Sequence, residues 1–176
     1  MNILLEYKIE ELSETQISLS QVKKFLLKQI KEEYNLDYVS KYHKDIKYLK
    51  EYYILPKRNN FYIAKNIKDN KILGTIGIRE YDTYCNDFSN SYCKKDTASF
   101  YRVFVDKEYR RRGIASNLVN IGENFCYNND FKIIYLHTQK FVDGALSFWT
   151  KNDFQVRFDS NNKLKTVHMD KYIFNS

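Results

Sequence analysis

The spacing of apolar residues changes at Pro56, the only proline of the chain. Before it, apolar residues recur every three or four positions with lysines between them, which predicts an amphipathic helix over 18–34. A second such series over 39–53 predicts another helix that ends before Pro56, because a residue that precedes proline disfavours helical backbone. After Pro56 the apolar residues gather in short runs, so the chain must combine helices with strands.

The remaining runs predict strands and two more helices. Helices are expected over 114–125, where apolar residues again follow the helical period, and over 142–151. The expected strands are 3–9, 61–65, 71–80, 98–105, 132–137, 154–158 and 165–172. The resulting order, β-α-α-β-β-β-α-β-α-β-β, predicts an α/β fold with a single mixed central sheet and helices on both faces. We expect one domain over residues 1–176.

Composition excludes several classes of protein. Hydrophobic residues make up 43% of the 176 residues and charged residues 29%, so the chain is neither disordered nor membrane-spanning by composition. Glu6 interrupts the first apolar residues, so we expect no signal peptide. The three cysteines form no C-x-x-C pair, which argues against a disulfide framework and a metal site and favours a cytoplasmic protein with reduced thiols.

Residues 103–116 carry the sharpest local signal for chemistry. A predicted strand runs into the basic turn Arg110-Arg111-Arg112, then Gly113, then a predicted helix. The first turn of a helix presents unpaired N–H groups and the positive end of the helix dipole, and glycine lets a ligand approach the backbone closely. This arrangement suits a pyrophosphate. The alternative is an ordinary charged helix start with a turn glycine, and the sequence lacks both the P-loop and the dinucleotide-binding glycine spacings.

Two motifs link the chain to a known family. Residues 110–115 read R-R-R-G-I-A, which matches Q/R-x-x-G-x-G/A, and residues 105–115 match the longer form V-x-x-x-Y-R-x-x-G-I-A. Residues 145–154, A-L-S-F-W-T-K-N-D-F, match A-x-x-F-Y-x-x-x-G-F in part. With these motifs at this spacing, the chain resembles the GNAT superfamily of acetyl-CoA-dependent N-acetyltransferases.

The resemblance implies acetyl-CoA as cosubstrate. Backbone N–H groups of about 111–116 would hold its pyrophosphate, the backbones of Val103 and Val105 would bind the pantetheine arm, and one of these N–H groups would stabilise the oxyanion. Phe148 and Trp149 would pack beside the pantetheine or, alternatively, serve only as core aromatics. The full implied set for coenzyme A is Val103, Phe104, Val105, Arg110, Arg111, Arg112, Gly113, Ile114, Ala115, Ser116, Phe148, Trp149 and Lys151.

The chain departs from the family pattern at the catalytic positions. Ser99 occupies the place of the usual glutamate base, and Trp149 that of the usual tyrosine acid. An alkyl amine is almost entirely protonated at pH 7, so something must accept its proton. Glu80, at the end of the strand expected to pair with that of Ser99, is the first candidate base, and His137 is the second. Asp153 replaces the usual glycine, with an effect expected only on a turn.

The leading hypothesis is transfer of an acetyl group from acetyl-CoA to a primary amine. The missing catalytic residues motivate an alternative from another class, a non-catalytic acyl-CoA-binding sensor. The net charge of +7 would suit nucleic acid, but lysines and tyrosines are scattered, so we expect neither nucleic acid nor membrane as a partner. The acceptor remains open among small amines, antibiotics, polyamines and proteins, and a homodimer is compatible with the sequence.

The remaining candidate residues receive simpler interpretations. Asp82 and Asp87 in the predicted 82–96 loop mildly favour a cationic acceptor. We expect His43 and His168 to be structural and Cys126 to be a small packed residue.

Overall fold

The computed structural model describes residues 6–82 and 92–173. Its strands are β1 (Tyr7–Glu11), β2 (Asn60–Asn66), β3 (Ile72–Glu80), β4 (Thr97–Val105), β5 (Ile133–Gln139), β6 (Gln155–Asp159) and β7 (Thr166–Tyr172). Its helices are α1 (Gln16–Tyr34), α2 (Lys44–Lys47), the π-helix η1 (Lys50–Ile54), the 3-10 helix η3 (Lys107–Tyr109), α3 (Ile114–Asn128) and α4 (Ala145–Lys151). None of the helices in the described ranges is long and apolar enough to cross a membrane.

The strands form a seven-stranded mixed sheet in the order β1-β2-β3-β4-β5-β7-β6. β4 and β5 pair in parallel, whereas β1 with β2, β2 with β3, β5 with β7 and β6 with β7 pair antiparallel. Backbone bonds at both ends of β3 place it antiparallel to β4: Asp106 N–H donates to the Leu73 carbonyl, and Tyr81 N–H to the Thr97 carbonyl. The predicted mixed α/β fold is confirmed.

Three predicted segments differ in detail. The second helix, expected over 39–53, begins only at Lys44 and consists of α2 and η1. The segment before α2 is a turn, which the His43 Nδ1 atom closes by accepting the Val39 N–H at 2.9 Å. The first strand is 7–11 rather than 3–9, of which residues 3–5 lie outside the described ranges. Most of the predicted 82–96 loop, with Asp87 and Cys85, also lies outside them.

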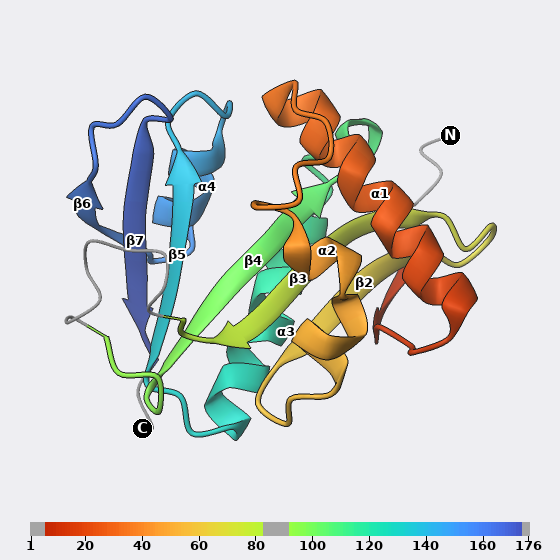
Figure 1. The fold of residues 1–176 in the computed structure, drawn as a ribbon, viewed down its shortest axis with the longest axis horizontal. Helices are drawn as coiled ribbons and strands as arrows, with labels where there is room; N and C mark the ends of the chain where they lie inside the picture. The colour runs from red at the N-terminus through yellow and green to blue at the C-terminus, as the bar shows by residue number, and fades with distance from the viewer. Residues whose placement is uncertain (1–5, 83–91, 174–176) are drawn as a thin grey trace. The chain divides into compact units, whose positions relative to one another are not determined.

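The chain divides into two compact units, the first formed by residues 1–78 and 102–122 and the second by 79–101 and 123–176. In the first unit, helices lie on both faces of β3 (Figure 1). A Cβ atom added to Gly74 would lie 3.1 Å from Leu118 of α3, whereas one added to Gly77 would lie 2.7 Å from the Tyr53 ring of η1. Glycine at these two positions lets both helices approach the strand closely.

Arg102 holds an unusual backbone conformation inside β4. Its φ is +53°, a left-handed value that costs a residue with a Cβ atom about 1–2 kcal/mol, and a left-handed residue inside a strand is typical of a β-bulge. The guanidinium bonds both carboxylate oxygens of Asp45 at 2.9 and 2.6 Å, and Tyr53 Oη donates to that carboxylate at 2.7 Å. Thr75 Oγ1 donates to the Arg102 carbonyl at 2.7 Å, so both the side chain and the backbone of Arg102 are fixed.

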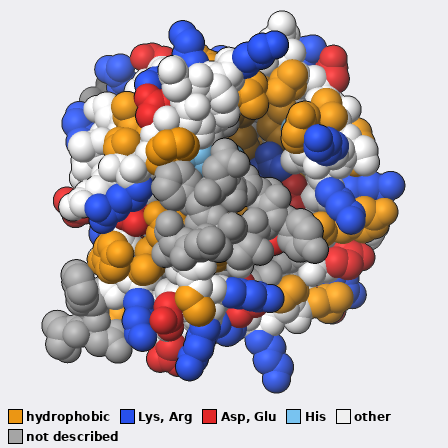
Figure 2. Space-filling view, turned by 60° about the vertical axis from the view of Figure 1, so that its left-hand side comes forward, with side chains coloured by type: hydrophobic (Ala, Val, Ile, Leu, Met, Phe, Trp, Pro, Cys, Tyr) orange, Lys and Arg blue, Asp and Glu red, His pale blue; other side chains and the backbone are white. Residues whose placement is uncertain are grey.

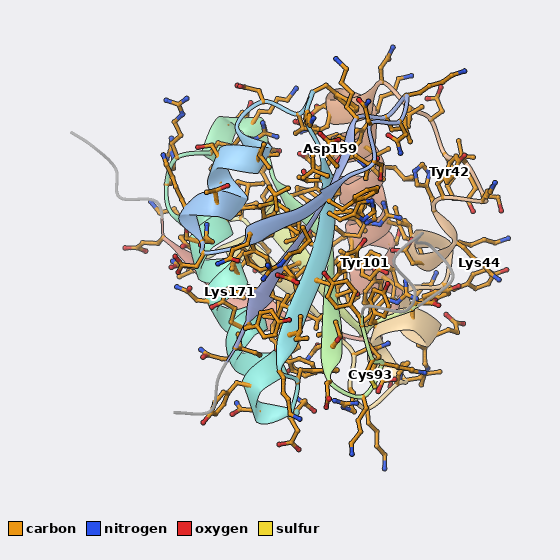
Figure 3. All side chains as sticks on the ribbon, turned by 90° about the vertical axis from the view of Figure 1, so that its left-hand side faces the viewer. Tyr42, Lys44, Cys93, Tyr101, Asp159 and Lys171 are labelled. Carbon is orange, nitrogen blue, oxygen red and sulfur yellow. The ribbon has the colours of Figure 1, made fainter. Side chains whose placement is uncertain are left out.

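In the second unit, β4, β5 and β7 present two distinct faces. Toward α4, Phe100 packs on Phe154, which in turn packs on Trp149. Lys171 of β7 lies over the Phe154 ring and bonds Glu123 of α3 at 2.8 Å, so it belongs to the same face. Figure 3 labels Lys171 and Tyr101 on opposite sides of β5. The opposite face is therefore the one that carries Ser99 and Tyr101 of β4, since side chains alternate along the strand before Arg102.

We call the bonds that Asp45, Tyr53 and Thr75 form around Arg102 the Arg102 clamp. This clamp predicts a large loss of stability when the carboxylate of Asp45 is removed. Asp45→Ala leaves a largely buried guanidinium without its carboxylate partner, which typically lowers the free energy of unfolding by about 3–5 kcal/mol. Tyr53→Phe removes one hydroxyl only and should lower it by about 1 kcal/mol. Urea unfolding followed by circular dichroism measures both, and equal losses from the two variants would contradict the clamp.

Candidate functional site

The loop after β4 is fastened to α1 by charged side chains. Asp106, which is buried, accepts a hydrogen bond from Lys28 Nζ at 3.0 Å and caps η3 through the Glu108 N–H at 3.2 Å. Burial raises the pKa of the Asp106 carboxyl, but the Lys28 ammonium and the Glu108 N–H outweigh burial and leave that pKa below its usual value. The loop therefore leaves the strand in one fixed direction.

Two of the four basic residues of this loop also bind α1. Lys107 Nζ donates to the Glu32 carbonyl at 3.3 Å. Arg110 pairs with the carboxylate of Glu33, and its Nε donates to the Val105 carbonyl at 3.0 Å. From the sequence we expected Arg110 to bind ligand phosphates, whereas in the structure its guanidinium holds the loop against α1. An anion at this loop would therefore depend chiefly on the other two arginines.

Arg111, Arg112 and Gly113 form the exposed turn between η3 and α3. Arg111 and Gly113 both have left-handed backbones, with φ of +60° and +78°. The Arg112 guanidinium lies over the Tyr109 ring at 5.7 Å, and within residues 6–82 and 92–173 neither Arg111 nor Arg112 forms an ion pair. A Cβ atom at Gly113 would meet nothing within 4 Å, so the backbone here is open to a ligand.

The first turn of α3 follows this turn directly. Its first helical bond runs from the Asn117 N–H to the Gly113 carbonyl at 3.0 Å. The N–H groups of residues 114–116 precede that bond and have no partner within the helix. Ile114 is buried and anchors the helix start, while Ala115 and Ser116 are half-buried. Unpaired N–H groups, the positive end of the helix dipole and two exposed arginines together fit a pyrophosphate.

The backbone of β4 presents alternate residues to β3. The Phe104 carbonyl lies toward Gly74 of β3, and Asp106 N–H bonds the Leu73 carbonyl at 2.9 Å. Because N–H and C=O directions alternate along a strand, Val103 and Val105 direct their backbone groups away from β3. This orientation is the one that the bonds expected to a pantetheine arm require. Phe104 itself is buried and packs on Tyr34 of α1.

The second motif lies on α4. Trp149 is buried between Phe148 and Phe154, at ring distances of 5.0 and 5.1 Å. Phe148 is half-buried, and Lys151 is exposed in the last turn. Asp153 has a φ of +66°, which explains why the family pattern has glycine there: the position needs a left-handed backbone, which Asp tolerates better than most residues.

The two candidate bases lie on different faces of the second unit. Glu80 pairs with Lys94 at 3.4 Å. Its neighbours Arg79 and Tyr81 contact the rings of Tyr101 and Tyr135, so Glu80, which lies between them, points to the other face. His137 is exposed and lies two residues after Tyr135 on β5, on the Tyr135 face. The structure therefore does not bring Glu80 and His137 together.

Ser99 lies on the same face as His137. Its Cα partner in the β4–β5 ladder is Tyr135, and paired residues direct their side chains to one face. Ser99 is buried, and in the part of the chain that the structure describes its Oγ has no hydrogen-bond partner. A polar atom in this state costs about 1–3 kcal/mol, so the family's base position carries an unsatisfied hydroxyl here.

Sequence reasoning missed a hydrogen-bonded chain beside Ser99. Tyr135 Oη lies 2.7 Å from His168 Nδ1, and Ser160 Oγ lies 2.7 Å from His168 Nε2. His168 was expected to be structural, and that expectation did not include these two bonds. The missing information was the β5–β7 register, which pairs His137 with His168 and cannot be read from a single strand.

The other sequence candidates have structural surroundings. His43 is buried, and burial followed by the nearby Arg102 charge lowers its pKa. Cys126 is buried as expected, whereas Cys93 is an exposed thiol. The described residues contain no group of three or more His, Cys, Asp or Glu that could hold a metal ion. Asp82, expected to attract a cation, pairs with Arg79 at 3.4 Å.

Charge is dispersed among the described side chains of the face in Figure 2. On the face in Figure 2, Lys and Arg side chains lie around the rim with acidic side chains between them, rather than in one continuous patch. Among the described side chains of that face, this distribution offers no continuous basic track for a nucleic acid backbone.

The lowered pKa of the Asp106 carboxyl in the folded protein predicts that the free energy of unfolding depends on pH. Asp106→Ala should lower the free energy of unfolding by about 1–2 kcal/mol near neutral pH, because it removes a cap and the Lys28 bond. A carboxyl whose folded pKa is depressed stabilises above its unfolded pKa of about 3.9 and loses that contribution as pH falls through the folded value. Urea unfolding should therefore show the difference from the native chain shrinking below about pH 4. Asp37→Ala, at an exposed ion pair, is the control, and a loss that does not change with pH would contradict the linkage.

The comparisons with known proteins agree with this geometry. A sequence model described as the acetyltransferase (GNAT) family matches residues 27–154. No curated protein sequence matches the chain.

Solved structures of acetyltransferases share the fold. An acetyltransferase of the GNAT family from Staphylococcus aureus Mu50 has 23% identity and a TM-score of 0.76, covering 95% of this chain and 99% of its own. An acetyltransferase from Streptococcus agalactiae has 18% identity and a TM-score of 0.75, with coverages of 95% and 98%. The PaiA N-acetyltransferase from Thermoplasma acidophilum, solved with coenzyme A, has 20% identity and a TM-score of 0.67, with coverages of 96% and 100%. With the family model spanning most of its length, this chain belongs to the GNAT family of acetyltransferases, which use acetyl-CoA as their acyl donor.

Proposed function

We propose that this chain is an N-acetyltransferase that moves the acetyl group of acetyl-CoA to a primary amine. The observation that carries the proposal is the turn before α3, where unpaired N–H groups of 114–116 follow the open Gly113 backbone and two exposed arginines. The backbones of Val103 and Val105 are oriented to bind the pantetheine arm. Their N–H groups would also polarise the thioester carbonyl and stabilise the oxyanion. Arg111 and Arg112 would pair with the phosphates, and Phe148, Trp149 and Lys151 would add contacts from α4.

The acceptor belongs to the class of primary amines, and its identity is open. Such an amine must lose a proton before it attacks the thioester, since the ammonium form has no lone pair. Glu80 and His137 remain the candidate bases from the sequence. We further propose a single domain over 1–176 that acts in the cytoplasm as a monomer or a homodimer.

One observation favours a second function. Ser99 and Trp149 occupy the family's base and acid positions, and neither side chain can transfer a proton usefully at neutral pH. A module that binds acyl-CoA without transferring the acyl group would need neither residue. The two functions share the coenzyme A site and differ only in turnover.

Coenzyme A binding is tested with two matched glycine variants. Gly113 and Gly144 have similar left-handed φ values, +78° and +72°, and open space at the Cβ position. Gly113→Ala and Gly144→Ala should therefore lose similar stability, about 1–2 kcal/mol each, from backbone strain. We expect only Gly113→Ala to weaken the rise in melting temperature that coenzyme A gives the native chain, because its new methyl group meets the pyrophosphate.

Thermal unfolding with increasing coenzyme A measures this difference. A flat response of the native chain at millimolar coenzyme A would contradict the site itself. Equal responses from the two glycine variants would place the anion site elsewhere.

Turnover is tested with a panel of primary amines and release of free thiol from acetyl-CoA. The native chain should acetylate at least one amine. If Glu80 or His137 is the base, Glu80→Gln or His137→Gln should lower kcat/KM by roughly 10²–10⁴ with coenzyme A affinity unchanged. Coenzyme A binding without transfer to any amine would favour the non-catalytic module instead.

A further inference from the structure

Both candidate bases of the sequence leave the proton of the amine with no defined route. Glu80 points away from the face that carries Ser99. The exposed His137 lies on β5, two residues beyond Tyr135, which is the residue paired with Ser99. The side chain that lies beside Ser99 in the β4–β5 ladder is Tyr135. Tyr135 is therefore the titratable side chain that the β4–β5 register places directly beside the family's base position.

Tyr135, His168 and Ser160 are joined by a continuous series of hydrogen bonds. Its Oη lies 2.7 Å from Nδ1 of His168, whose Nε2 lies 2.7 Å from Ser160 Oγ. Tyr135 and His168 are 2% and 8% exposed, whereas Ser160, in the hairpin between β6 and β7, is half-buried. This series of hydrogen bonds thus leads from the interior beside Ser99 to the surface of the hairpin between β6 and β7.

The neighbouring carboxylate is not available as the proton acceptor. Asp170 lies on the same face, but its oxygens bond Arg157 at 2.6 Å and Tyr92 at 2.9 Å. Burial and the Asp170 bond raise the pKa of Tyr92 well above its usual value, so Tyr92 stays protonated and donates to Asp170. Because Arg157 and Tyr92 occupy the Asp170 oxygens, the group that bonds the Tyr135 hydroxyl directly is His168, and an imidazole can accept a proton near neutral pH.

We propose that Tyr135, His168 and Ser160 form the proton relay that replaces the missing glutamate of this acetyltransferase. The proposal rests on the proposed function. Tyr135 is the catalytic residue, since its Oη would contact the amine, and His168 acts through it.

The relay accounts for every proton of the reaction. The ammonium gives one proton to Tyr135 Oη as the phenolic proton passes to His168 Nδ1, and the resulting imidazolium releases its Nε2 proton through Ser160 to solvent. The neutral amine then attacks the thioester carbonyl, the C–S bond breaks, and the second amine proton goes to the departing thiolate. The products are the amide, coenzyme A thiol and one proton in solution.

Removing the phenolic hydroxyl tests the relay with little change in volume. Tyr135→Phe should lower kcat/KM for an alkyl amine by roughly 10²–10⁴ at neutral pH, with coenzyme A binding unchanged. The same variant should acetylate aniline, which is already neutral at pH 7, nearly as fast as the native chain. A merely structural role would slow both amines alike. Tyr172→Phe, an exposed tyrosine on the strand of His168, is the control.

The pH profile provides a second measurement. In the native chain, kcat/KM for the alkyl amine should fall at low pH as His168 becomes protonated, and His168→Asn should abolish this limb. Melting temperatures of both variants show that they fold. Among the described residues, the titratable or charged groups that contact His168 or its bonded partner Tyr135, or that lie on the same face of β7 or pair with a group there, are Tyr81, Tyr92, Tyr135, His137, Arg157 and Asp170, and each could shift this limb.

A double variant tests whether the relay occupies the role of the glutamate. Ser99→Glu in the Tyr135→Phe background should recover part of the lost rate, because it restores a carboxylate beside position 135. Full activity of the folded Tyr135→Phe and His168→Asn variants with the alkyl amine would overturn the relay and leave the proposed function unaffected. Absence of transfer by the native chain to every amine would overturn the proposed function and the relay together.

Discussion

The ion pair between Arg102 and Asp45 fixes the strand on which the proposed chemistry depends. Arg102 has a left-handed backbone in the middle of β4, a conformation that would relax without other contacts. The bidentate pair, the Tyr53 hydroxyl on the same carboxylate and the Thr75 bond to the Arg102 carbonyl oppose that relaxation. The direction of Val103 and Val105, and therefore any bond to a pantetheine arm, depends on this clamp.

The four basic residues of the loop after β4 fall into two pairs with different surroundings, although they lie in one sequence motif. Lys107 and Arg110 bind α1, while Arg111 and Arg112 extend from a turn with left-handed residues on either side of Arg112. A loop held on one side by ion pairs can keep its N–H groups in place before a ligand arrives. Such preorganisation reduces the ordering cost of binding.

The second unit offers a physical reason for the loss of the family's acid and base side chains. Trp149 fills a core position among Phe148 and Phe154, where a large ring contributes more through burial than a phenol would. Ser99 lies against a strand that carries Tyr135, and in the proposed relay His168, one strand further, would perform the role of the carboxylate.

Local sequence by itself determined the element order, the strand–turn–helix segment and the glycine at its centre, because each depends on the period and conformational preference of neighbouring residues. It also located the family motifs at 110–115 and 145–154. Only the tertiary structure decided that Arg110 turns back onto Glu33, that Glu80 and His137 face apart, and that Tyr135 meets His168. These outcomes depend on contacts between residues far apart in the chain, whose register and facing are set by strand pairing and helix packing rather than by any one segment.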